Sequence, residues 1–283
     1  MQVVDRKTKN EYTYEPSKFV KYMYENKSGR FFLKLLNNRF MANLSRIYMN
    51  TFLSIPYKNK IIKKNNVDMS LYEDKKYLSY NSYFTRRLKK LNFVKDNKVF
   101  IAPCESKLLV LKIDNDTSFD IKGSKYTLSE ILKDDIYKEY NGGYAMIFRL
   151  EATNYHRYIF LDSGTRDEYK FIKGKLNTVQ PIAYKHFKVF HENCREWTVL
   201  HTDNFDSVIH MEIGAMMIGR INNNDKREFN RGDEKGFFSF GGSTILLLVK
   251  KNIIKINDDI MNNSLEFKET TVNIGEEVAK KIK

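Results

Sequence analysis

Cysteine is scarce in this sequence, and this scarcity excludes two classes of protein. Cys104 and Cys194 are the only cysteines among 283 residues, too few for a disulfide framework or a four-cysteine zinc site. Such usage is typical of a reducing compartment. The first residues lack the apolar core of a signal peptide, and no apolar run approaches the roughly 20 residues of a membrane span. We therefore expect an intracellular, cytoplasmic protein that is soluble or peripheral to a membrane.

Several common functional motifs are also missing. The sequence has no Gly-rich phosphate loop, no dinucleotide fingerprint, no HExxH and no Gly-x-Ser-x-Gly elbow. The histidines are dispersed, without ligand-like pairing on a helix, at His156, His186, His191, His201 and His210. We therefore expect no metal centre.

Positive charge and aromatic residues are abundant. The 49 basic and 35 acidic residues give a net charge of +14, which suits a polyanionic partner such as nucleic acid or an anionic membrane leaflet. A lysine-rich composition spread over a solvated surface explains the same number. Aromatic residues make up 14% of the chain, more than a disordered chain carries, so this chain folds around a core.

Residues 1–95 are predicted to be mostly helical. Between residues 31 and 52, apolar residues recur at three- and four-residue spacing and form one stripe on a helix; they are Leu33, Leu36, Phe40, Leu44 and Ile47. A basic cluster at residues 58–64 follows. A basic amphipathic segment of this kind can lie in a membrane interface. The same stripe can equally pack on a domain core, and the sequence leaves both open.

Capping-box spacings predict further helices that begin at Ser70 and at Thr127, the second reaching about Tyr140. Residues 81–90 form another candidate basic helix. From about residue 96 onward, short apolar runs separated by Gly, Asn and Asp predict strands at 107–113, 144–150, 207–214 and 244–250. We expect an α+β protein in which a helical portion, residues 1–95, precedes a β-rich domain of mostly antiparallel strands, residues 96–283.

The segment around Gly241-Gly242-Ser243 supports two interpretations. Two glycines between apolar strands commonly form a tight β-hairpin turn. Alternatively, Gly242 lets a neighbouring hydroxyl approach its carbonyl closely. Ser243 can then attack that carbonyl in an N-to-O acyl shift, and elimination followed by hydrolysis leaves a pyruvoyl group.

Seven stretches decide between these interpretations by their content and their order. They are Asn81-Ser-Tyr-Phe-Thr-Arg-Arg-Leu-Lys, Ala102-Pro-Cys-Glu-Ser-Lys107, Ile121-Lys-Gly-Ser-Lys-Tyr-Thr-Leu, Leu150-Glu-Ala-Thr-Asn-Tyr155-His156-Arg157, Asn193-Cys-Arg195, Glu212-Ile-Gly-Ala-Met-Met-Ile-Gly219 and Phe240-Gly-Gly-Ser-Thr. In this order they resemble the phosphatidylserine decarboxylase family across roughly residues 75–275. The resemblance implies a lyase that makes phosphatidylethanolamine from phosphatidylserine at the cytoplasmic membrane face.

The resemblance also implies a site. Gly242–Ser243 would be the self-cleavage bond of a proenzyme, and Ser243 would become the pyruvoyl group that accepts electrons when carbon dioxide leaves. The two products would be a long β chain and a short α chain that stay together. His156, in Tyr-His-Arg, would be the proton donor near the pyruvoyl group. Arg157 is expected to be structural or to pair with a carboxylate.

Two positions depart from the family pattern of serine, histidine and aspartate. Ile159 stands where the family has the second histidine, and Glu105 stands where it has the aspartate. Because a serine hydroxyl without a base is a poor nucleophile, either His156 or Glu105 must substitute, or cleavage is slow.

Several alternatives therefore stay open. The chain can be an uncleaved homologue that binds lipid without catalysis, or a decarboxylase of another amino-acid-like substrate. We expect anionic lipid rather than nucleic acid as its partner, because no nucleic-acid-binding motif is present. A homodimer is possible.

Overall fold

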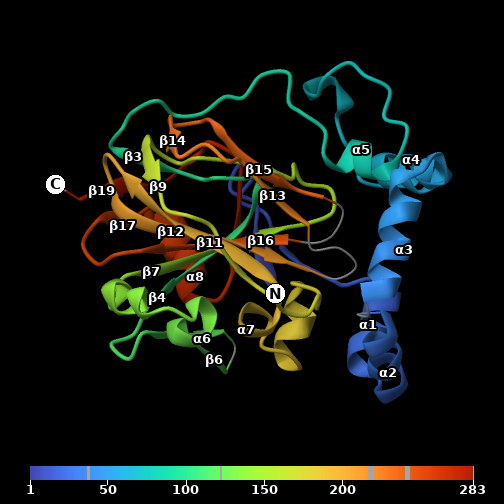
Figure 1. Cartoon of the computed structure of the whole chain (residues 1–283), viewed down its shortest axis with the longest axis horizontal. Coiled ribbons are helices and arrows are strands. Elements are labelled where there is room, and N and C mark those ends of the chain that lie inside the picture. Colours follow the sequence, from blue (N-terminus) through green and yellow to red (C-terminus); the bar gives the residue numbers. More distant parts are fainter. Residues whose placement is uncertain (37–38, 122, 216–219, 240–242, 283) are drawn as a thin grey trace.

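The computed structural model describes residues 1–36, 39–121, 123–215, 220–239 and 243–282. Within these residues an eleven-stranded, mostly antiparallel sheet forms the centre, and three smaller sheets and short helices surround it (Figure 1). Helices account for 27% of the residues and strands for 34%. The α+β class predicted from the sequence is confirmed.

Four strands in the middle of the sheet place the region of interest. They are β4 (Ser106–Lys112), β7 (Tyr144–Leu150), β12 (Asp206–Gly214) and β16 (Ser243–Val249). All four were predicted to within one residue at either end. Alternate side chains of β16 enter two different apolar clusters, with Ile245 and Leu247 on one face and Leu246 and Leu248 on the other. Because both faces are covered, β16 reads as a continuous apolar run.

Other strands extend the sheet on both sides and build the smaller ones. The large sheet also contains β1 (Gln2–Val4), β2 (Glu11–Thr13), β9 (Gly164–Arg166), β10 (Lys170–Ile172), β11 (Arg195–Thr202), β14 (Glu228–Phe229) and β18 (Glu269–Val272). The smaller sheets consist of β8 (Arg157–Ile159), β13 (Ile221–Asn223) and β15 (Glu234–Phe238); of β3 (Val99–Ile101), β17 (Ile254–Ile256) and β19 (Glu277–Lys281); and of β5 (Ser118–Ile121) and β6 (Ser124–Thr127). Helices of this body are α6 (Leu128–Leu132), η3 (Asp135–Tyr140), η4 (Pro181–Lys185), α7 (Val189–Glu192) and α8 (Asp258–Leu265).

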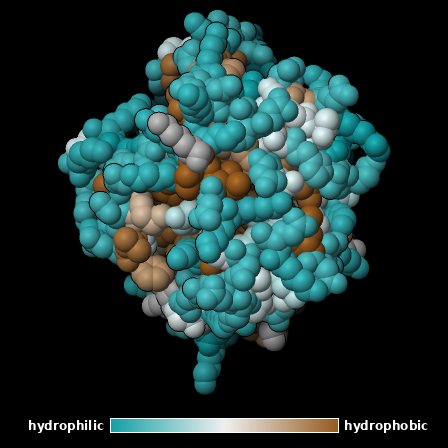
Figure 2. All heavy atoms as spheres, turned by 90° about the vertical axis from the view of Figure 1, so that its left-hand side faces the viewer, coloured by the Kyte–Doolittle hydropathy of each residue, from teal (hydrophilic) through white to brown (hydrophobic). Residues whose placement is uncertain are grey.

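A helical arm stands along one side of this body, on the right in Figure 1. It consists of α1 (Lys18–Glu25), α2 (Lys27–Leu36), α3 (Arg39–Asn50), η1 (Phe52–Ser54), α4 (Ile55–Lys64) and α5 (Tyr80–Phe84). Among the described residues, none of the helices has the length and apolar character needed to cross a bilayer. The side of the molecule opposite the arm is mostly hydrophilic, with small apolar patches (Figure 2).

The predicted stripe at residues 31–52 falls on α2 and α3 and divides between two environments. Leu33 is buried, whereas Leu44 and Ile47 are 45% and 59% exposed. The exposed part of the stripe therefore does not pack on the core of this chain. For Leu36 and Phe40, the side chains lie outside the described part of the structure.

Three helix predictions need correction. Residues 70–73 do not start an α-helix. Only the short 3-10 helix η2 (Met69–Leu71) forms there, and the Asp68 side chain caps η2. The capping box that does form uses Ser79 and Ser82 and starts α5, which ends at Phe84 rather than near residue 90. Similarly, the helix expected from Thr127 to Tyr140 breaks at Lys133, which adopts a left-handed conformation between α6 and η3.

The first thirteen residues form strands within the portion, residues 1–95, that was predicted to be mostly helical. Strand β1 pairs in parallel with β18, with Val3 opposite Glu269, and β2 pairs with β1. Two strands of three residues are too short to leave a period-2 pattern, so their partner in the sheet decides their conformation.

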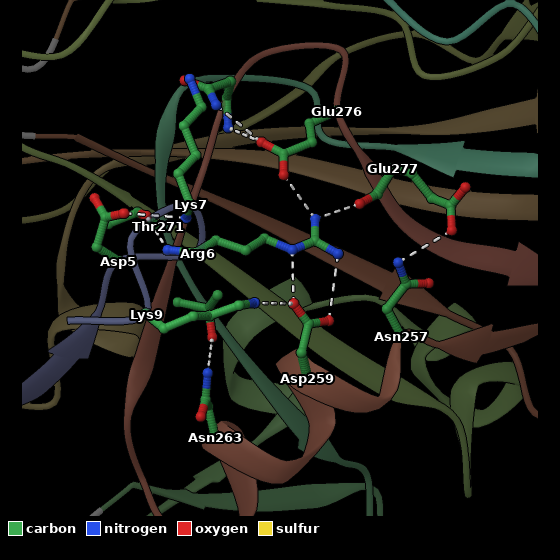
Figure 3. A network of polar contacts seen from close by, with 12 residues as sticks. Asp5, Arg6, Lys7, Lys9, Asn257, Asp259, Asn263, Thr271, Glu276 and Glu277 are labelled. Atoms are coloured by element: carbon green, nitrogen blue, oxygen red, sulfur yellow. Dashed lines mark hydrogen bonds and ion pairs between the residues drawn. The ribbon is translucent and has the colours of Figure 1, made fainter. Parts of the chain in front are cut away.

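Arg6 joins this N-terminal hairpin to the C-terminal segment (Figure 3). Its Nε donates to Asp259 Oδ2 at 2.8 Å, and its Nη1 donates to Glu276 Oε1 at 2.8 Å and to the Glu277 carbonyl. Burial raises the pKa of the Asp259 carboxyl, but the hydrogen bond and charge of Arg6 outweigh this, and the pKa lies below its ordinary value of 3.8.

We predict that Arg6→Gln lowers the free energy of unfolding by about 1 to 2 kcal/mol at pH 7, since partly exposed charge-assisted hydrogen bonds are lost. An aspartate with a depressed pKa stabilises the fold above its unfolded pKa, and this contribution disappears as the pH falls through the folded value. The gap between wild type and variant should therefore close below about pH 4. Urea unfolding followed by the fluorescence of the buried Trp197 measures it.

Lys9→Gln is the matched control. Lys9 Nζ lies 3.9 Å from the same Asp259 carboxylate, but its side chain is 68% exposed, so its loss should change stability by less than about 0.5 kcal/mol. An equal effect of both variants would contradict the role assigned to Arg6.

Candidate active site

A cavity of about 360 Å³ lies between the arm and one end of the central strands. Its walls come from α4, from α5, and from the chain segments 149–153 and 178–180. Leu150, one of the lining residues, is the register partner of Ser243 across β7 and β16. The cavity therefore adjoins the strand end at which the cleavage site was predicted.

Ser243 is the first residue of β16, and it pairs with Gly214 of β12 on one side and Leu150 of β7 on the other. Its side chain is 1% exposed, and its hydroxyl has no hydrogen-bond partner within the described residues. A buried hydroxyl without a partner is costly, and Ser243 Oγ shares this property with other buried atoms such as Ser106 Oγ and Thr244 Oγ1.

The hairpin interpretation of the Gly-Gly pair is wrong. Strands β15 and β16, on the two sides of that pair, lie in different sheets, β15 with β8 and β13 and β16 with β7 and β12. Gly242, the other half of the predicted scissile bond, lies outside the described residues, as do residues 216–219 and 240–241.

His156 is completely buried at the end of the loop that follows β7. Its ring stacks on Phe84, with centroids 3.6 Å apart, and Phe84 lines the same cavity as Leu150. The Nδ1 atom lies 2.9 Å from the Asn154 carbonyl oxygen, and Nε2 has no partner within the described residues. A carbonyl only accepts, so Nδ1 carries the proton and Nε2 presents a lone pair.

The electrostatic surroundings keep this histidine neutral. Burial, and secondly the nearby charge of Arg86, hold the pKa of His156 well below its usual 6.5. At neutral pH the ring is therefore a proton acceptor at Nε2 rather than a proton donor.

Arg86 is a residue whose role sequence reasoning missed. Its buried guanidinium lies over the rings of Tyr72 and Tyr83 and donates through Nη2 to the carbonyls of Thr153 and Asn154. The Asn154 carbonyl thus accepts from both Arg86 and His156. Arg86 stood within a stretch that carried the family resemblance, but only the fold reveals that it holds the histidine loop.

Glu105 lies on the other side of the same loop. Its two carboxylate oxygens accept from the Asn154 side-chain amide at 2.6 Å and from the Tyr155 backbone N–H at 3.1 Å. The structure thus brings Glu105 and His156 together through Asn154. This arrangement suits a positioning role, and a role for Glu105 as the base that activates Ser243 stays a prediction.

Ile159 lies on β8, where its backbone N–H donates to the Pro103 carbonyl at 2.9 Å. It lines a small cavity together with Arg157 and Glu234. Arg157 forms an ion pair with Glu234 at 2.7 Å, in line with the carboxylate partner expected for it. Because Gly242 is not described, the prediction that position 159 faces the scissile bond stays untested.

Two buried charge networks flank the central strands. In one, Arg149 on β7 is bidentate to Glu269 and also contacts Glu151. In the other, Lys235 on β15 pairs with Glu212 on β12. This second pair joins β15, the strand that precedes the predicted cleavage site, to the large sheet. Over the described ranges, no three His, Cys, Asp or Glu side chains gather into a group that could hold a metal ion.

Comparison with known proteins assigns the family. The profile of the phosphatidylserine decarboxylase family matches residues 80–280. Phosphatidylserine decarboxylase proenzyme 2 of Clostridium acetobutylicum is 42% identical over 263 residues, covering 92% of this chain and 90% of that protein. The phosphatidylserine decarboxylase proenzyme of Clostridium beijerinckii is 35% identical over 296 residues, covering 100% and 99%. That of Clostridium tetani is 35% identical over 289 residues, covering 98% and 97%.

The resemblance drawn from seven short stretches is thereby confirmed over most of the chain. Four of those stretches contribute Arg86, Glu105, His156 and Ser243. The first three have contacts with the loop at residues 153–155, and Ser243 pairs with Leu150 at the strand end before that loop. The chain belongs to the phosphatidylserine decarboxylase family of carboxy-lyases.

Proposed function

We propose that this chain is a proenzyme that cuts itself between Gly242 and Ser243 and then converts phosphatidylserine to phosphatidylethanolamine. The observation that carries the proposal is the buried hydroxyl of Ser243 at the start of β16, which has no hydrogen-bond partner among the described residues, in a chain of this family. Cleavage would give a long chain of residues 1–242 and a short chain of residues 243–283.

The cleavage chemistry needs a hydroxyl, a base and an adjacent carbonyl. Ser243 Oγ attacks the Gly242 carbonyl carbon, and its proton goes to a base. The peptide bond becomes an ester, and the Ser243 nitrogen is freed as an amine. A base then takes the Cα proton of residue 243, the Cβ–O bond breaks, the long chain leaves as a carboxylate, and dehydroalanine remains at position 243. Hydrolysis of dehydroalanine then releases ammonia and leaves the pyruvoyl group.

We assign the base to His156 and a positioning role to Glu105. The fixed Nδ1–H leaves the Nε2 lone pair available, and the depressed pKa keeps it unprotonated at neutral pH. Glu105 holds Asn154 and Tyr155, and so holds the loop that orients the ring. Nε2, after it has taken up a proton, is also the atom from which a proton could return to the substrate carbon.

The residues present fit a pyruvoyl group at position 243. Ser243 Oγ and His156 Nε2 are buried and have no hydrogen-bond partner in the part of the chain that the structure describes. Their residues adjoin the same cavity through Leu150 and Phe84. Such a group would supply a carbonyl that takes up the electron pair released with carbon dioxide. The chain itself would exclude water and hold the proton.

We further propose that the arm binds the cytoplasmic membrane face peripherally. Large apolar side chains are exposed on it, namely Phe31, Phe32, Leu44, Ile47, Tyr48, Phe52 and Leu53. The following helix α4 carries four lysines at positions 58, 60, 63 and 64. Apolar side chains that enter the interface and lysines that attract anionic lipid are the two components of peripheral binding.

We predict that the protein floats with phosphatidylserine-containing liposomes at low salt and detaches as salt screens the lysines. Ile47→Glu and Phe52→Glu should each reduce the floated fraction several-fold, because a carboxylate resists burial in the interface. Phe171→Glu is the control, since Phe171 is 60% exposed but belongs to β10 of the large sheet rather than to the arm. Flotation that all three variants weaken equally would argue against a specific role of the arm.

A further inference from the structure

A second cavity, of about 450 Å³, lies between the arm and the segment that precedes the predicted cleavage site. Its lining comes from α3 and its end, from α5, and from the body through Arg220 and Ser239. The Ser239 backbone N–H donates to the Arg220 carbonyl at 3.1 Å, and Ser239 stands four residues before Ser243. One wall of this cavity is therefore tied to the approach to Ser243.

The charges around this cavity are unbalanced. Arg46 enters from α3 and Arg220 from the body, and neither forms an ion pair within the described part of the chain. Among the described residues that line the cavity, none carries a carboxylate. In the first cavity, by contrast, Arg149 is neutralised by Glu269 and Glu151. Two guanidinium groups that share a cavity without a counter-charge favour a bound anion.

The apolar residues beside this cavity indicate that the bound anion is part of an amphiphile. Ile47 lines the cavity beside Arg46, and Leu44 and Phe52, on or next to the same helix, are exposed. Hydrocarbon along the arm would place a polar group at the two arginines, in a cavity that is also lined by Ser239, four residues before Ser243. A phosphodiester between a diacylglycerol and a small head group has this order of parts, and arginine binds phosphate oxygens in pairs.

We propose that Arg46 and Arg220 bind the phosphodiester of the phospholipid substrate. This inference rests on the proposed function and adds to it the two residues that recognise the substrate's phosphate. The arm then serves both as a membrane contact and as one half of the substrate site. Recognition of the phosphate is separate from self-cleavage, which uses Ser243 and His156.

The experiment uses a short-chain phosphatidylserine that is soluble as a monomer, so that membrane attachment does not contribute. We expect Arg46→Gln and Arg220→Gln each to raise KM by about 10- to 100-fold, because each variant loses a charge-assisted hydrogen bond to the phosphate. The value of kcat and the extent of self-cleavage, followed by intact mass, should stay within about 3-fold of wild type. Arg220→Lys should recover part of the loss, because it keeps the charge but not the paired donors.

Lys27→Gln is the matched control, since it removes one positive charge from α2 of the same arm but lines a different cavity. Its KM should equal that of wild type. If KM is unchanged in both arginine variants, the inference is wrong while the proposed function stands. If KM rises equally in all three variants, the inference is also wrong, because the positive charge of the arm then attracts the anionic substrate without a specific site. A wild-type enzyme that cleaves itself but leaves phosphatidylserine untouched overturns the proposed function.

A binding measurement then tests the inference without turnover. Calorimetry should detect binding of glycerophosphoserine to the Ser243→Ala chain. Adding both Arg46→Gln and Arg220→Gln to that chain should remove this binding. Inorganic phosphate should bind more weakly by at least about 10-fold. Equal binding of inorganic phosphate, or glycerophosphoserine binding that survives loss of both arginines, contradicts the assignment to the lipid's phosphodiester.

Discussion

Ser243→Ala is expected to leave the purified protein as one chain of 33.6 kDa, whereas the unaltered sequence yields two chains. Alanine has no hydroxyl to attack the Gly242 carbonyl, so neither the ester nor the pyruvoyl group can form. Decarboxylation of phosphatidylserine should fall to the level of the uncatalysed control. Intact mass spectrometry of both proteins checks the cleavage, and the 41-residue short chain of the wild type should start with a blocked terminus.

Thr244→Val is the matched control for this change. Thr244 also has a buried hydroxyl without a partner within the described residues, but neighbouring residues of a strand point to opposite faces. Cleavage should survive this substitution. Two chains from Ser243→Ala would mean that an external protease cuts the protein, and loss of cleavage in Thr244→Val would mean that the hydroxyl has been misassigned.

The same mass measurement separates the enzyme from the alternative of an uncleaved lipid-binding homologue. If the wild type stays at 33.6 kDa and still floats with liposomes, the alternative is correct. If it is cleaved but acts on another amino-acid-like compound in preference to phosphatidylserine, the substrate assignment is wrong and the cleavage mechanism stands.

His156→Ala is expected to slow self-cleavage by about 100- to 10,000-fold, the usual contribution of a general base. The burial of His156 adds a pH signature. Since its pKa lies well below 6.5, the neutral base persists as the pH falls. The wild-type cleavage rate should stay level from pH 8 to 6.5 and decline only at lower pH. A time course of nascent protein on a denaturing gel measures both effects.

A rescue experiment tests the assignment of the base. Ile159→His combined with Glu105→Asp restores the family's residues, and it should speed appearance of the short chain and restore cleavage to His156→Ala. Glu105→Gln should slow cleavage less than His156→Ala. The single side-chain oxygen of the glutamine can still accept one of the two hydrogen bonds from Asn154 and Tyr155, and only the other is lost. If Glu105→Gln and His156→Ala together leave complete cleavage at the earliest time point, neither residue acts as we propose.

The sequence alone determined the central strands and the family. Residues 144–150 were predicted as a strand and form β7, because a strand buried on both faces must be apolar at nearly every position. Motifs such as Tyr-His-Arg and Gly-Gly-Ser-Thr point to chemistry only through their resemblance to the phosphatidylserine decarboxylase family, since each motif alone is weak. Ser243 and His156 were selected as candidate site residues from these motifs, and their roles stay predictions.

Only the tertiary structure decided how the candidate site is held together. The helix expected over residues 81–90 ends at Phe84, and Arg86, two residues later, is buried against tyrosines and the carbonyls of residues 153–154. Local periodicity cannot predict a contact across a separation of 67 residues. Tertiary packing overrides helix propensity here because a buried guanidinium needs all the acceptors that the histidine loop offers.

The roles of the charged residues depend on the fold for the same reason. Glu105 was a candidate base from its motif, but its two oxygens are engaged by Asn154 and Tyr155. Arg46 and Arg220 stand 174 positions apart in the sequence and line one cavity. A net charge of +14 indicates an anionic partner. That these two arginines line one cavity follows only from how the arm packs against the body.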